Sequence, residues 1–195
     1  MKTAIVWFKT DLRLADNETL LKAISKCEKI IPLYCFDEAH FKTTTYGLKK
    51  TGSYRAQFLL ESLQDLDYNL RQLGSGLIVV QGKPEVEIPK IVEQFKVQKV
   101  FAKTEVAFEE KQTEQLVRKA LFKLRCELET FSTSTLYHPD DLPFSFSFSF
   151  SITLSFSSNC TTNAHPHLFR LGLCSLLSCP TKLGRQYRGE YTDAL

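Results

Sequence analysis

Several common sequence signals are missing from this chain. It has no run of about 18 consecutive apolar residues, so no membrane-spanning helix is predicted. Its first residues lead directly into a strand-like run and lack the layout of a secretory signal peptide. The formal net charge of +3 is too small to argue for a nucleic-acid-binding surface. The main basic cluster, Lys42, Lys49, Lys50 and Arg55, is expected to be solvated. We therefore expect a cytoplasmic monomer with no membrane partner.

Signatures of catalysis and metal binding are also scarce. The chain contains neither G-x-G-x-x-G nor a P-loop, which argues against a stand-alone nucleotide-binding protein. It has no G-x-S-x-G elbow. His138, His165 and His167 have no thiol or carboxylate partner at the spacing of a metal site, so no metal is expected. The six cysteines form no C-x-x-C pair, which favours buried free thiols over disulfides.

Strand-like and helix-like segments alternate up to Pro143. Short apolar runs predict strands that end near Phe8, Phe36, Val80 and Ala102, and residues 126–131 predict a fifth. Leucines repeat every three or four residues between 59 and 73, which predicts a helix that begins at Ser53 and stops before the glycines at 74 and 76. Alternating strands and helices require crossover connections. The predicted fold is therefore α/β, a Rossmann-like open five-stranded parallel sheet with helices on both faces.

Two prolines lie inside these predicted elements. Pro32 suggests that its strand is at an edge of the sheet, or that the proline lies in the strand's first turn. Pro89 should kink its helix or delay its start. The expected core of the sheet comprises Ile5, Val6, Trp7, Leu33, Ile78, Val79, Val100 and Leu128.

The chain changes character at Phe144. Phenylalanine and serine alternate over residues 144–151, and the remainder shows no helix or strand of useful length. We expect one domain over residues 1–143 and an irregular low-complexity tail over residues 144–195. The preferred interpretation of the tail is an aberrant end, such as a retained intron or a shifted frame; the alternative is a genuine segment that begins as a half-buried strand.

Four blocks of the sequence resemble one known family. Residues 6–17 are similar to W-F-R-N-D-L-R-L-x-D-N, with Lys9 and Thr10 in place of the arginine and asparagine. Residues 51–63 resemble T-G-x-x-R-A-Q-F-L-x-E-S, and residues 105–110 resemble E-V-x-x-x-E. Residues 136–143 resemble the exit from the first domain of DASH members. In this order, the blocks resemble the photolyase/cryptochrome family, and its DASH branch in particular.

The resemblance implies a division of labour. An α/β domain of this family holds an antenna chromophore, methenyltetrahydrofolate or a deazaflavin, and the DASH branch resembles the folate users. A separate helical domain holds FAD and contacts DNA for photorepair. We therefore expect an antenna-binding domain truncated before the FAD domain, which neither binds FAD nor repairs DNA alone. The alternatives are a stand-alone small cofactor-binding α/β protein and an inert product of a damaged gene.

The expected site lies where parallel sheets bind ligands, beyond the carboxyl ends of the strands. Glu105 follows the fourth strand, and its carboxylate can accept hydrogen bonds from a pterin-like N–H edge. Alternatively, Glu105 helps to cap the helix near Glu109, and Asp11 and Arg13 pair with each other or with their loop. The candidate cofactor-binding residues are Phe8, Asp11, Arg13, Phe36, Arg55 and Glu105.

Overall fold

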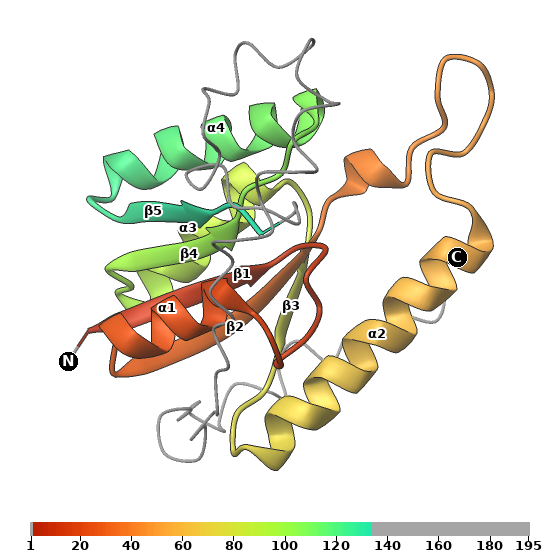
Figure 1. Cartoon of the computed structure of the whole chain (residues 1–195). Helices are drawn as coiled ribbons and strands as arrows, with labels where there is room; N and C mark the ends of the chain where they lie inside the picture. The colour runs from red at the N-terminus through yellow and green to blue at the C-terminus, as the bar shows by residue number, and fades with distance from the viewer. Residues whose placement is uncertain (1, 134–195) are drawn as a thin grey trace, which may run out of the picture.

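The computed structural model describes residues 2–133, which form one parallel sheet with helices packed against it (Figure 1). The strand order is β3-β2-β1-β4-β5, and all four neighbouring pairs are parallel. The predicted fold class is therefore confirmed. The strands are β1 (Thr3–Phe8), β2 (Lys29–Phe36), β3 (Ile78–Gln81), β4 (Lys99–Lys103) and β5 (Glu127–Phe131).

The helices begin and end close to their predicted positions. The helical elements are α1 (Glu18–Lys26), the short 3-10 turn η1 (Glu38–His40), α2 (Ser53–Gln72), α3 (Pro84–Phe95) and α4 (Phe108–Lys123). The side chain of Asn17 accepts from the backbone N–H of Leu20 and so caps α1. Within residues 2–133, no helix is long and apolar enough to cross a bilayer.

The two faces of the sheet bury separate apolar clusters. Ile5 and Trp7 of β1 pack with buried residues of α3 and α4, such as Ile88 and Val117. Alternate residues of β1, Ala4, Val6 and Phe8, pack with α1 and with the C-terminal half of α2. This period of two is what a strand covered on both faces produces. Trp7, the chain's single tryptophan, is 5% exposed.

The prediction for the core was right at six of eight positions. Ile5, Val6, Trp7, Leu33, Val100 and Leu128 are buried. Ile78 and Val79, by contrast, are only half-buried. They lie in β3, which has a strand neighbour on one side only, and the prediction had not established which strand would be the edge.

For each proline, the structure rules out one of the two predicted alternatives. Pro32 does not mark an edge strand, because β2 lies between β1 and β3. It is tolerated because the pairing of β2 with β3 begins only at Leu33, so β2 has a strand partner on one side at the proline. Pro89 does not delay the start of α3, since the helix begins at Pro84 and includes Pro89.

The helix α2 has two unlike halves. Its C-terminal half packs on the sheet through Leu66 and Leu70, which are 2% and 0% exposed. In its N-terminal half Tyr54 and Phe58 are 88% and 71% exposed. This half and the loop before it extend away from the sheet (Figure 1).

Candidate functional site

The loop that follows β1 is fixed from within. Asp11 is 7% exposed, and its carboxylate accepts from the backbone N–H of Lys9 at 3.1 Å. The side-chain amide of Asn17 donates to the carbonyl and to the carboxylate of Asp11, at 3.3 and 3.4 Å. Asp11 therefore holds the loop in shape, in line with the alternative that this residue pairs with its own loop.

Arg13 stabilises the same loop. Its guanidinium donates two hydrogen bonds to the carbonyl of Asp16, at 3.2 and 3.1 Å. Asp16 has a φ of 51°, a left-handed conformation that few residues other than glycine adopt. The two hydrogen bonds brace this strained turn, so the alternative in which Arg13 pairs with the adjacent loop accounts for its position.

Glu105 lies directly beside the end of β1. Its Oε1 accepts a hydrogen bond of 2.9 Å from the hydroxyl of Thr10. The ammonium group of Lys103 donates to the same hydroxyl oxygen at 3.0 Å. The N-cap of α4 is Ala107, which makes no side-chain cap hydrogen bond, so the capping alternative for Glu105 is wrong. The carboxylate instead belongs to a polar group at the ends of β1 and β4.

Lys9 connects this polar group to the protein interior. Its ammonium donates to the carbonyl of Lys103 at 2.9 Å and lies 3.7 Å from a carboxylate oxygen of Glu114. It also lies 4.4 Å from the centroid of the Trp7 ring. Burial lowers the pKa of Lys9, and the nearby carboxylates, Glu114 first, act against that shift.

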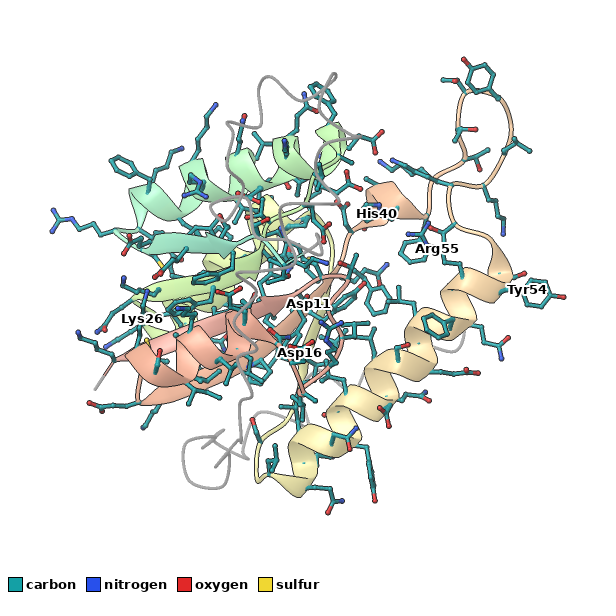
Figure 2. The ribbon with its side chains drawn as sticks, viewed as in Figure 1. Asp11, Asp16, Lys26, His40, Tyr54 and Arg55 are labelled. Carbon is teal, nitrogen blue, oxygen red and sulfur yellow. The ribbon has the colours of Figure 1, made fainter. Side chains whose placement is uncertain are left out.

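Aromatic side chains lie at the end of the neighbouring strand. The ring of Phe36 meets that of Tyr34 edge-on, with centroids 5.0 Å apart, and that of Phe41 at 6.1 Å. Burial raises the pKa of Tyr34 to about 12, and the charge of Arg55 opposes this shift. Arg55 points from α2 toward the body of the protein, whereas Tyr54 points away (Figure 2). The ring of Phe36 therefore contacts Tyr34, and the charge of Arg55 acts on Tyr34 from α2.

Gly82 holds the end of β2 against the end of β3. Its N–H donates to the carbonyl of Phe36 at 2.9 Å, and its φ is 140°. A Cβ at this position would lie 3.0 Å from Cγ of Glu87. Glycine is required here because the backbone conformation is unfavourable for other residues and the space is limited.

Phe8 does not lie in the site. Its side chain is fully buried in the cluster shared with α1 and α2. It lies on the same face of β1 as Ala4 and Val6, where α1 and α2 cover it completely. A ligand at the strand ends would therefore meet the residues after Phe8 and not its ring.

The loop before α2 is linked to the start of α4. In this loop Thr43 and Lys49 form an antiparallel bridge, and Lys50 donates its backbone N–H to the carbonyl of Lys42. Lys50 also forms an ion pair with Glu109, at the start of α4. That ion pair lowers the pKa of Glu109. One member of the basic cluster is therefore paired and not simply solvated.

Metal-ligand groupings do not occur within residues 2–133. The three histidines weighed above lie outside the described residues. Cys27, Cys35 and Cys126 are buried free thiols, as predicted for these three. Burial raises the pKa of Cys35 to about 12 and that of Cys126 to about 11, so neither is a ready nucleophile.

The sequence interpretation missed three polar or aromatic contributors to this edge. Thr10, Lys103 and Tyr34 were not among the candidate cofactor-binding residues, although Thr10 and Lys103 lie at strand ends where ligands of such sheets bind. The signal that could have found Thr10 is its place inside the block that contains Asp11 and Arg13.

These features define an open parallel α/β domain with a carboxylate and aromatic rings at the carboxyl ends of its strands. The sequence pattern of the DNA photolyase family matches residues 4–164. A cryptochrome DASH of Gloeobacter violaceus is 44% identical over 144 residues, which cover 74% of this chain and 29% of that protein. The chain belongs to the photolyase/cryptochrome family and corresponds to its N-terminal region.

Solved structures agree with the sequence comparison. The crystal structure of a cryptochrome from Synechocystis sp. PCC6803 is 40% identical and superposes with a TM-score of 0.71, covering 74% of this chain and 30% of that one. An archaeal photolyase from Sulfolobus tokodaii, solved with two FAD molecules, is 26% identical with a TM-score of 0.63 and is covered to 32%. The chain thus spans about 30% of the length of these relatives.

Proposed function

We propose that this α/β domain holds a light-harvesting chromophore, methenyltetrahydrofolate or a deazaflavin, at the carboxyl edge of its sheet. The observation that carries the proposal is the Glu105 carboxylate, held by Thr10 between the ends of β1 and β4. A carboxylate there can accept paired hydrogen bonds from the N–H edge of a pterin.

The residues at this edge fit such a group. Glu105 supplies acceptors, Phe36 and Tyr34 supply ring surfaces, and Arg55 supplies a cation for an anionic tail. The bound chromophore would absorb light and pass its excitation to a flavin, and the protein's part is to bind and orient it.

The same proposal assigns no repair chemistry to these 195 residues. Repair would require a flavin held beside an extruded base in a site that excludes water. The match covers only about 30% of the length of the relatives. Trp7 has a side chain that could carry an electron, but its ring is buried in the core against the ammonium of Lys9. We expect the purified chain to retain no FAD and to repair no thymine dimers in light. Stoichiometric flavin that co-elutes with the chain would contradict this expectation.

Antenna binding is tested by titration with methenyltetrahydrofolate, followed by absorbance and by fluorescence. The wild-type chain should bind it, and Glu105→Gln should weaken binding about 10-fold or more, as loss of a charged acceptor does. Glu28→Gln is the matched control, because Glu28 is exposed and lies at the opposite, amino edge of the sheet. Equal affinity in all three proteins would show that Glu105 does not hold the ligand.

A further inference from the structure

The two positions at which this chain departs from the family pattern meet in one hydrogen-bonded group. Lys9 and Thr10 stand where the pattern has arginine and asparagine. Both side chains bind residues at the end of β4: Lys9 binds the backbone of Lys103, and Thr10 binds Glu105. The departures therefore fall on the side chains that join β1 to the proposed ligand-binding carboxylate.

The hydrogen bonds give the Thr10 hydroxyl one direction. A threonine hydroxyl has a single proton to donate. The ammonium of Lys103 has no lone pair, so it must be the donor in its 3.0 Å contact with the hydroxyl oxygen. Ionised Glu105 can only accept, so the hydroxyl proton points to its Oε1 at 2.9 Å.

Lys103 is held both at its side-chain ammonium and at its backbone carbonyl. Its carbonyl accepts from the ammonium of Lys9, which is fixed between the carboxylate of Glu114 and the ring of Trp7. The side chains of Lys9 and Glu114 are only 11% and 13% exposed, so their positions are set by packing. The order Lys9, Lys103, Thr10, Glu105 therefore runs from the packed interior to the exposed hydroxyl of Thr10 and the half-exposed carboxylate of Glu105.

We infer that Thr10 is a positioning residue that presents the Glu105 carboxylate to the ligand, with Lys103 orienting its hydroxyl. The inference rests on the proposed function of Glu105. A half-exposed glutamate samples several rotamers, and fixing it only when a ligand arrives costs affinity. Thr10 holds the Glu105 carboxylate in place before the ligand arrives. Thr10 therefore raises the affinity for the chromophore without contacting it.

The test compares Thr10→Val, which keeps the shape and removes the hydroxyl, with Thr10→Ser, which keeps the hydroxyl. For methenyltetrahydrofolate, Thr10→Val should raise the dissociation constant about 3–10-fold, the effect of losing one hydrogen bond that is exposed to solvent. Thr10→Ser should remain within about 2-fold of the wild type. Thr113→Val is the control, because the Thr113 hydroxyl makes a comparably exposed hydrogen bond, to the carbonyl of Glu109 within α4.

A double-mutant cycle separates positioning from a general structural role. If Thr10 acts through Glu105, Thr10→Val should have no further effect on binding in the Glu105→Gln background. An equal loss in both backgrounds, or a loss in Thr10→Ser as large as in Thr10→Val, would overturn the inference.

A ligand-free measurement keeps the two proposals distinguishable. The carboxyl ¹³C resonance of Glu105 should shift in Thr10→Val and stay in place in Thr113→Val. If the wild-type chain binds no folate yet this shift occurs, the hydrogen-bonded pair exists and the proposed function fails. If folate binds but neither the shift nor the coupling appears, the proposed function stands and the positioning role is wrong.

Discussion

Two neighbouring regions of the molecule differ in how far their side chains are buried. The first comprises the carboxyl ends of β1 and β4. The second comprises the loop before α2 and the first half of that helix. At the first, Asp11 is buried and Lys9 is nearly so, and a continuous set of hydrogen bonds joins them to Thr10 and Glu105. In the second, Tyr46, Tyr54 and Phe58 are 89%, 88% and 71% exposed. The first is tied by hydrogen bonds to buried residues, whereas in the first half of α2 only Ala56 is buried. The comparison predicts where mutations should matter.

The two halves of α2 provide the largest expected contrast. Leu70→Ala should lower the free energy of unfolding by about 2–5 kcal/mol, since it removes a fully buried side chain from the sheet. Phe58→Ala, in the exposed half, should change it by no more than about 0.5 kcal/mol. Chemical denaturation of both variants measures the difference. A large loss in Phe58→Ala would show that this half is packed after all.

The buried ion pair beneath the edge gives the next largest effect. Lys9→Met removes the donor to Lys103 and leaves Oε2 of Glu114 without its nearest ammonium, which should cost about 1–3 kcal/mol. Adding Glu114→Gln should recover part of that loss, because in Lys9→Met the only cation among residues 2–133 still paired with Glu114 would be Arg118, which contacts its other oxygen. Strict additivity of the two losses in urea titrations would argue against coupling.

Lys9 should also leave a signature in pH dependence. Its pKa is lowered in the folded state from an ordinary value of 10.5, so the unfolded chain binds more protons between these two pKa values. In that window its contribution to the free energy of unfolding rises with pH, and it is lost as pH falls through the lowered pKa. Relative to Lys9→Met, the wild type should therefore gain stability as pH approaches 10.5. A difference that is flat with pH would contradict the lowered pKa.

The smallest expected difference in stability is between the loop after β1 and the loop before α2. Asn17→Ala removes the cap of α1 and the amide that holds Asp11, and should cost about 1–2 kcal/mol. Tyr46→Ala, in the loop before α2, should leave stability within about 0.5 kcal/mol of the wild type. Thermal unfolding of the two variants measures the difference. Equal losses of stability would show that the two loops do not differ in this way.

The regular elements could be predicted from the sequence because their signals are local. The leucine spacing placed the start of α2 at Ser53, and alternating strand and helix patterns predicted the parallel sheet. Burial of Ile78 and Val79 could not be predicted in this way, since it depends on which strand forms the edge. The tail over residues 144–195 lies outside the described residues and stays a prediction.

The site was predicted only in part for a similar reason. Glu105 was found from its place after a strand and from the resemblance, but its partner Thr10 is 95 positions away in the chain. No local pattern reveals such a pair. Phe8 was named because it ends β1, yet α1 and α2 cover its side chain completely. That cover depends on how the helices pack over the sheet, which the sequence of β1 does not show.

The most direct test of the central claim maps where a folate touches the chain. Methenyltetrahydrofolate is titrated into isotopically labelled protein, and backbone amide resonances are followed by NMR. The account predicts that the largest shifts fall in residues 9–11, 34–37 and 104–106, at the carboxyl ends of β1, β2 and β4. Shifts concentrated at the amino edge of the sheet, or no saturable shifts at all, would contradict it.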